Sequence, residues 1–147
     1  MQNSVMTSIS ATFYIEAMDH MTTVLIIDDE TAIADMLVDI VEEYGYMALR
    51  ANNGAEGLSL ARQHRPELII SDVMMPIMDG YTMLRAIRSE PELAATTVVL
   101  VSAGVMLDMP SNDMPNADGF MQKPFDLQVV DQLLRAIEPS QRSQGSG

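Results

Sequence analysis

The segment ELIISDVMMPIMDG, residues 67–80, places Asp72 directly after a short apolar run. Residues 67–71 have the length and apolar composition of a buried strand, while the proline and the Asp79-Gly80 pair that follow are typical of a loop. The segment therefore predicts a strand that leads into a carboxylate. That carboxylate either opens the loop or belongs to a chemical site, and the other strand ends of the chain bear on this choice.

Strand and helix patterns alternate along the rest of the chain. Four further segments are typical of strands, within residues 22–30, 46–51, 96–102 and 119–122. Apolar residues at helical spacing, together with capping and terminating residues, predict helices within residues 33–44, 53–66, 80–91 and 127–137. Short apolar strands that alternate with helices predict an α/β fold, with a doubly wound parallel sheet and helices on both faces.

Polar residues follow four of the five predicted strands, at Asp28, Asp29, Asp72, Ser102 and Lys123. In a parallel sheet these ends share one edge, where binding sites form. Three carboxylates brought together repel one another, so either one of them holds a proton at a raised pKa or a cation neutralises them. A hard divalent cation such as Mg²⁺ is the simpler answer. An aspartate can also act as a nucleophile and form an aspartyl phosphate if Mg²⁺ and a lysine offset the charge.

Each of these residues also has an ordinary structural interpretation. The pair Asp28-Asp29 can cap a helix, and Asp72 can open a turn. Ser102 can make a local hydrogen bond, and Lys123 can be a solvated charge. Independent coincidences at four of the five strand ends are less plausible than one common site, so the combination favours chemistry.

The motifs LIIDDE, LIISDVMMPIMDG, VLVSAG and ADGFMQKPF stand in the order found in the receiver domains of two-component response regulators, which residues 22–138 resemble. The resemblance implies the flavodoxin-like strand order 2-1-3-4-5. It also implies a phosphoryl donor, either a histidine kinase or a histidine phosphotransfer protein. Residues 1–21 would then be an N-terminal extension and residues 139–147 a flexible tail.

The resemblance assigns the acidic residues to phosphorylation and metal binding. Asp72 would be the phosphorylated residue. Asp29 and Asp72 would bind Mg²⁺ together with the main-chain carbonyl of Met74, while Asp28 would act largely through a bound water.

The same resemblance assigns the remaining residues to switching and to hydrolysis. Ser102 would hydrogen-bond the phosphoryl group, Lys123 would pair with it, and Phe120 would be the switch aromatic. Met74 and Gly104 occupy the two positions that tune hydrolysis in the family, and neither offers a polar side chain to orient water. Self-dephosphorylation should therefore be slow at most, and we expect no other enzymatic activity.

The segment AGVMLDMPSNDMPNADG, residues 103–119, departs from the family pattern. Pro110 and Pro115 each remove a backbone donor and obstruct the preceding turn. We expect the fourth helix of the family to be short or irregular in this chain.

Composition limits the partners. The net charge of −13 disfavours contact with nucleic-acid phosphates and with anionic membranes. The apolar runs are too short to span a bilayer, and the chain has no cysteine, so we expect a cytoplasmic protein without disulfides.

Two functions remain open at this point. The first is a phosphorylation-dependent switch that controls the binding of a downstream protein, which the sequence does not identify. The second is a phosphorylation-independent interaction adapter with the receiver fold. Only nine residues follow Glu138, so we expect no output module after the domain. A related hydrolase would carry an acid at position 74, and a nucleotide binder would need a glycine-rich loop in place of the residues DDET.

Overall fold

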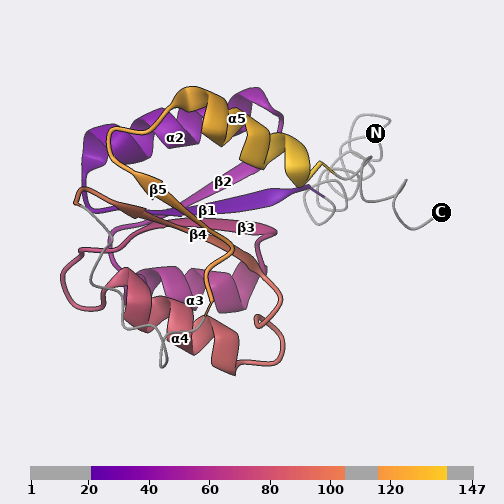
Figure 1. Ribbon diagram of the computed structural model, residues 1–147. Helices are drawn as coiled ribbons and strands as arrows, with labels where there is room; N and C mark the ends of the chain where they lie inside the picture. Colours follow the sequence, from indigo (N-terminus) through magenta and orange to yellow (C-terminus); the bar gives the residue numbers. More distant parts are fainter. Residues whose placement is uncertain (1–20, 105–115, 139–147) are drawn as a thin grey trace, which may run out of the picture.

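The computed structural model describes residues 21–104 and 116–138, and within them it contains a five-stranded sheet and four helices (Figure 1). The strands are β1 Thr23–Ile27, β2 Met47–Ala51, β3 Leu68–Asp72, β4 Thr97–Ser102 and β5 Gly119–Gln122. The helices are α2 Thr31–Glu43, α3 Gly54–His64, α4 Gly80–Ser89 and α5 Leu127–Ala136.

The strands are all parallel and lie in the order β2-β1-β3-β4-β5, which confirms the predicted strand order. The register places Ile27 beside Ser71 in β3, and Asp72 beside Val101 in β4. The carboxyl ends of β1, β3 and β4 therefore meet at one edge of the sheet.

Helices cover both faces of the sheet, as the sequence predicts. Figure 1 shows α2 and α5 on one face and α3 and α4 on the other. Successive residues of a strand point to opposite faces, so Val24 and Ile26 pack under α2 and α5, while Leu25 and Ile27 pack under α3 and α4. Each of these four side chains is fully buried, and burial of one aliphatic side chain contributes about 1.5–3 kcal/mol.

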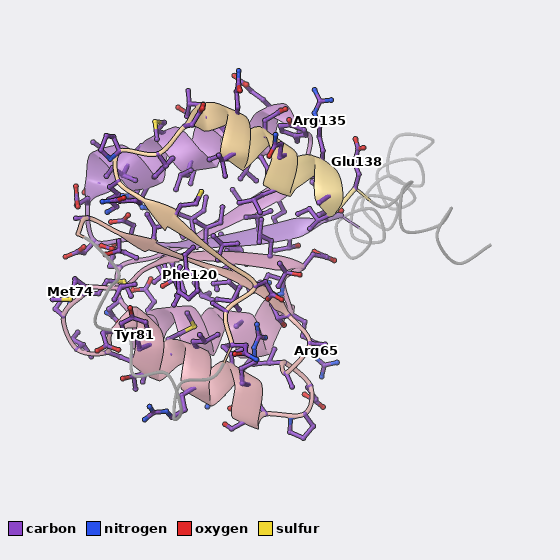
Figure 2. All side chains as sticks on the ribbon, viewed as in Figure 1. Arg65, Met74, Tyr81, Phe120, Arg135 and Glu138 are labelled. Atoms are coloured by element: carbon purple, nitrogen blue, oxygen red, sulfur yellow. The ribbon has the colours of Figure 1, made fainter. Side chains whose placement is uncertain are left out.

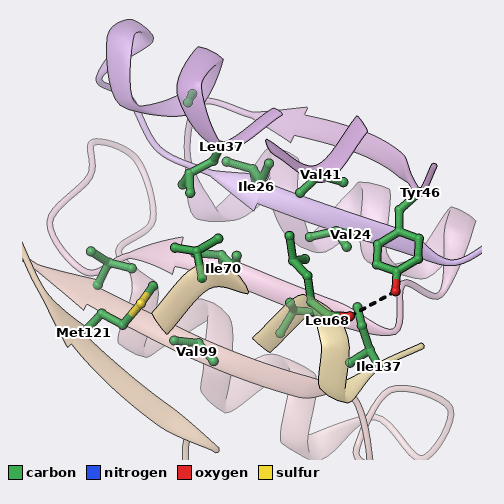
Figure 3. Packing of buried hydrophobic residues seen from close by; sticks show 14 residues of the cluster. Val24, Ile26, Leu37, Val41, Tyr46, Leu68, Ile70, Val99, Met121 and Ile137 are labelled. Carbon is green, nitrogen blue, oxygen red and sulfur yellow. Dashed lines mark hydrogen bonds between the residues drawn. The ribbon is translucent and has the colours of Figure 1, made fainter. Parts of the chain in front are cut away.

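The side chains packed between the sheet and helices α2 and α5 include one buried polar contact (Figure 3). The hydroxyl of Tyr46 donates a hydrogen bond to the carbonyl of Leu134 at 3.0 Å. This bond connects the residue before β2 to α5, so that α5 is fixed to the sheet on the side remote from β5.

Most helix ends follow the predicted signals. Asn53 and Asp126 accept hydrogen bonds from main-chain N–H groups in the first turns of α3 and α5, both at 2.9 Å. Gly45, just after α2, has a φ of +78°, a conformation that glycine adopts without strain. Helix α4 ends at Ser89 rather than at residue 91, because Glu90 precedes a proline and takes an extended conformation.

The prediction of a short or irregular fourth helix concerns the segment 103–119, of which residues 105–115 lie outside the described residues. The predicted N-terminal extension and C-terminal tail lie almost wholly outside them as well, so all three remain predictions. In the described part of the chain, no helix combines the length and the apolar character that crossing a membrane requires.

Candidate functional site

Two buried carboxylates form the centre of the site. Asp72 is the last residue of β3, and Asp28 follows β1, the neighbouring strand. Their side chains are only 6% and 4% exposed. Hydrogen bonds of the sheet continue past the strand ends, since the N–H of Asp28 donates to Ala51 at 3.1 Å and the N–H of Val73 donates to Val101 at 2.9 Å. These hydrogen bonds therefore fix the backbone that carries both carboxylates.

Asp29 adds an exposed carboxylate beside the two buried ones. One carboxylate oxygen from each of Asp28, Asp29 and Asp72 lies within 4.8 Å of the other two. Oxygen donors from carboxylates suit Mg²⁺, which commonly takes one or two of them and keeps several waters. The donor set thus fits a magnesium ion with Asp29 on its solvent side.

Lys123 brings a positive charge to the same place. Its ammonium nitrogen lies 3.0 Å from an oxygen of Asp28 and 3.4 Å from an oxygen of Asp72, and its side chain is 9% exposed. The main-chain N–H of Lys123 donates to the carbonyl of Ser102 at 2.7 Å, and the peptide bond to Pro124 is cis. The lysine is therefore fixed to the end of β4 and directed at the acidic pair.

A further carboxylate at this site was not predicted from the sequence. The ammonium of Lys123 also lies 3.1 Å from the carboxylate of Glu30, whose side chain is 58% exposed. The sequence offered one signal, the acidic residue directly after Asp28-Asp29, but a glutamate at a helix start commonly points into solvent.

Burial and charge shift the protonation of the central residues. Burial raises the pKa of Asp72 above its ordinary value, and repulsion by Asp28 adds to the rise, while Lys123 opposes it. For Lys123, burial lowers the pKa, but hydrogen bonds to Asp28 and Glu30 outweigh this effect and leave the pKa raised. The ammonium thus stays charged, and the Asp72 carboxylate would gain from a further cation.

The remaining predicted residues lie around this centre. Ser102 ends β4, and its hydroxyl makes local hydrogen bonds with the main chain of Gly104 at 3.2 and 3.3 Å. Phe120 in β5 is 45% exposed, and Met74, on the loop after β3, is 74% exposed (Figure 2). The structure therefore places Asp28, Asp29, Asp72 and Lys123 close together, while the roles predicted for all seven residues remain predictions.

Two glycines hold the loop that follows Asp72. The N–H of Gly80 donates to the carbonyl of Val73, and the N–H of Gly54 donates to the carbonyl of Met78, both at 2.9 Å. A Cβ atom on Gly54 would lie 2.7 Å from the Met78 carbonyl oxygen, closer than real Cβ contacts. Asp79 caps α4 by accepting from the N–H of Thr82 at 2.8 Å, so the Asp-Gly pair starts a helix as well as closing the loop.

The parallel sheet, the acidic group at its edge and the lysine that directly follows β5 define an α/β protein with a charged site at the carboxyl ends of its strands. Residues 24–136 match the response regulator receiver domain, and the chain belongs to that family.

Curated relatives agree with this assignment. The DNA-binding dual master transcriptional regulator RpaA of Synechocystis is 35% identical over 80% of this chain and 49% of its own length. The protein PilH of Pseudomonas aeruginosa is 28% identical over 80% of this chain and 98% of its own length. The chain thus spans about half the length of the former and nearly all of the latter.

Solved structures agree as well. The chemotaxis response regulator CheY4 of Vibrio cholerae superposes with a TM-score of 0.68 at 27% identity, over 80% of this chain and 99% of that one. The receiver domain of a signal transduction histidine kinase from Syntrophus aciditrophicus gives 0.66 at 34% identity, over 80% and 93%. The predicted family and fold are both confirmed.

Proposed function

We propose that this chain is a phosphoacceptor switch, in which Asp72 takes a phosphoryl group from a phosphohistidine donor in the presence of Mg²⁺. The donor would be a histidine kinase or a histidine phosphotransfer protein, met in the cytoplasm. The observation that carries the proposal is the position of the only lysine, 3.4 Å from Asp72, beside three carboxylates that lie within 4.8 Å of one another.

For the transfer itself, the protein has to position the reacting groups and to offset the negative charge on the phosphoryl group. A carboxylate oxygen of Asp72 attacks phosphorus, the P–N bond to the donor histidine breaks, and the electron pair returns to the imidazole. Negative charge then builds on the phosphoryl oxygens, where the ammonium of Lys123 can offset it. The main-chain hydrogen bond from Lys123 to the carbonyl of Ser102 already keeps the lysine near Asp72, so the transfer needs no large movement of its side chain.

The carboxylates of Asp28, Asp29 and Asp72 would hold the metal, with the main-chain carbonyl of Met74 as a further ligand. The ion would supply positive charge to the phosphoryl oxygens during transfer. The raised pKa of Asp72 supports this assignment, because a carboxylate that is costly to ionise alone is the one that gains most from a cation.

Phosphorylation would be transmitted through Ser102 and Phe120 to a downstream protein. Within residues 21–104 and 116–138, the hydroxyl of Ser102 makes hydrogen bonds only with the main chain of Gly104, at 3.2 and 3.3 Å, and it could exchange them for a phosphoryl oxygen. Phe120 is half-exposed on β5, the strand that leads to Lys123, so its side chain has space to move.

We propose no nucleic-acid partner and no membrane partner for this chain. A net charge of −13 repels phosphate backbones and anionic lipids over the surface as a whole.

The test is intact-mass measurement after incubation with acetyl phosphate, with and without Mg²⁺. The wild-type protein should gain one phosphate only with the metal, and Asp72→Asn should gain none. Asp39→Asn, which changes an exposed aspartate of α2, is the matched control and should label normally. A wild-type protein that takes no phosphate from acetyl phosphate or from phosphohistidine proteins would instead favour the phosphorylation-independent adapter.

A further inference from the structure

Helix α2 begins differently from the other three described helices. Asn53, Asp79 and Asp126 each cap their own helix through a side-chain oxygen. At the start of α2 the capping position belongs to Glu30, whose side chain makes no capping hydrogen bond within the described part of the chain. A capping side chain stabilises the first turn of its helix, and the side chain of Glu30 does not contribute in this way to α2.

The Glu30 carboxylate is instead directed at a residue far away in the sequence. It lies 3.1 Å from the ammonium of Lys123, which is 93 positions further along the chain. The backbone of Glu30 is fixed, because its N–H donates to the carboxylate of Asp28 at 2.8 Å and its carbonyl accepts from the N–H of Ala34 at 3.0 Å. The carboxylate can therefore leave Lys123 by rotation of the Glu30 side chain, without movement of the backbone.

Glu30 differs from the other two carboxylates that contact the lysine. Asp28 and Asp72 are almost fully buried and belong to the group that could hold a metal, whereas Glu30 is 58% exposed and lies outside that group. An ammonium has three N–H donors, and here three carboxylates surround it. A phosphoryl group on Asp72 must therefore take a donor from one of them, and Glu30 can be rehydrated most cheaply.

We infer that Glu30 is a positioning residue, which holds the ammonium of Lys123 on the solvent side and competes with the incoming phosphoryl group for it. This inference rests on the proposed function. Glu30 acts through the lysine and slows phosphorylation, because its contact must be released before Lys123 can pair fully with the phosphoryl oxygens. The distances agree with this role, since the ammonium is nearer to Glu30, at 3.1 Å, than to Asp72, at 3.4 Å.

The test compares initial rates of phosphorylation by acetyl phosphate at fixed Mg²⁺ concentration. Glu30→Gln keeps the size of the side chain and removes its charge, and it should react about two- to fivefold faster, the size expected when a partly exposed ion pair is lost. Glu30→Asp keeps the charge on a side chain one methylene shorter, and it should react as fast as Glu30→Gln because it cannot reach Lys123. Asp39→Asn, a charge removal elsewhere on α2, should not change the rate.

Two further measurements separate a contact with the lysine from a general charge effect. In a Lys123→Met background, Glu30→Gln should have no effect on the rate, since the residue through which it acts is absent. Higher ionic strength screens the exposed pair, so the rate ratio of Glu30→Gln to wild type should fall toward one.

The outcomes distinguish the two proposals. Labelling of the wild type with no acceleration in Glu30→Gln would overturn this inference alone, as would an acceleration that persists in the Lys123→Met background. If the wild type takes no phosphate while it is folded and supplied with Mg²⁺, the proposed function fails and this inference fails with it.

Discussion

Gly80 packs so closely against Asp72 that residue 80 has no space for a side chain. A Cβ atom there would overlap the carbonyl oxygen of Asp72 and would lie 3.0 Å from the Cα of Val73. The obstructing atoms are backbone, which cannot rotate away as the end of a flexible side chain could. The first residue of α4 thus sets the position of the strand end that carries the proposed phosphoacceptor.

We therefore expect Gly80→Ala to destabilise the protein by about 1–3 kcal/mol, the usual cost of overpacking. It should also slow the phosphorylation of Asp72, because relief of the overlap moves the end of β3. Urea unfolding and intact-mass labelling measure the two effects. Gly104→Ala is the control for stability, because no atom of the described residues would lie within 4 Å of a Cβ atom on Gly104. Equal unfolding free energies for the two variants would contradict the prediction.

Asp72→Asn should stabilise the metal-free protein at neutral pH. Burial and the nearby Asp28 raise the pKa of Asp72 in the folded state, so its ionisation costs folding free energy. This cost is present above the folded-state pKa and disappears as the pH falls below the value of an unfolded aspartate. The unfolding free energies of variant and wild type, measured in EDTA, should therefore differ most at neutral pH and converge in acid.

Magnesium provides the control for that comparison. Added Mg²⁺ should stabilise the wild type more than Asp72→Asn, because ligand binding to the folded state adds stability and the variant has lost one charged ligand. Asp39→Asn, at an exposed site on α2, should behave as the wild type does. A less stable Asp72→Asn at neutral pH in EDTA would mean that the ion pair with Lys123 outweighs burial and repulsion.

Asp29→Ala should abolish phosphorylation at millimolar Mg²⁺. Asp29 is the exposed member of the acidic group, so its truncation leaves the packing intact and removes one proposed metal ligand. Intact-mass labelling measures the loss, and thermal unfolding with and without Mg²⁺ shows whether metal binding has failed. Unchanged labelling would remove Asp29 from the site.

The central residues of the site could be predicted from sequence for a geometric reason. Once β1, β3, β4 and β5 are recognised as parallel strands, the residues at their carboxyl ends must share an edge. The location of Asp28, Asp72 and Lys123 could be predicted without further information, because each residue directly follows or ends a strand. Their positions depend on the backbone alone.

Residues that act through long side chains could not be predicted in this way. Glu30 could point to solvent or to the helix, and only the packed structure shows its contact with Lys123. Arg88 is similar: it donates to the carbonyl of Thr96 at 2.6 Å and pairs with Asp118 at 2.8 Å, so that α4 is joined to the strand that follows it and to the start of β5. The partner of a flexible side chain depends on which groups tertiary packing brings near it, and the local sequence does not determine this.

Lys123→Arg should keep the charge and lose most of the switching. The ammonium is enclosed by carboxylates of Asp28, Glu30 and Asp72 at 3.0, 3.1 and 3.4 Å, and its side chain is 9% exposed. A planar guanidinium is larger and donates along fixed directions, so it cannot occupy this space without displacing its neighbours. The amide shifts of Ser102 and Phe120 on addition of beryllofluoride and Mg²⁺ should be much smaller than in wild type. Wild-type shifts would show that charge alone is sufficient.

The phosphorylated protein should lose its phosphoryl group slowly when no partner is present. Hydrolysis needs a polar group that orients a water toward the phosphorus, in line with the bond that breaks. Met74 and Gly104, which we expect at the two positions that tune this step, offer no such group. The side chain of Met74 is 74% exposed, so it can be exchanged for a polar one without disturbing the core.

Met74→Glu and Met74→Asn are therefore expected to shorten the lifetime of the aspartyl phosphate and to leave the unfolding free energy within about 0.5 kcal/mol of wild type. Met74→Leu, which keeps an apolar side chain, is the matched control and should retain the slow rate. Loss of the added phosphate mass over time, after removal of acetyl phosphate, measures the three lifetimes against wild type. A wild-type half-life of seconds would refute the slow rate, and equal lifetimes in all four proteins would show that position 74 does not control the attacking water.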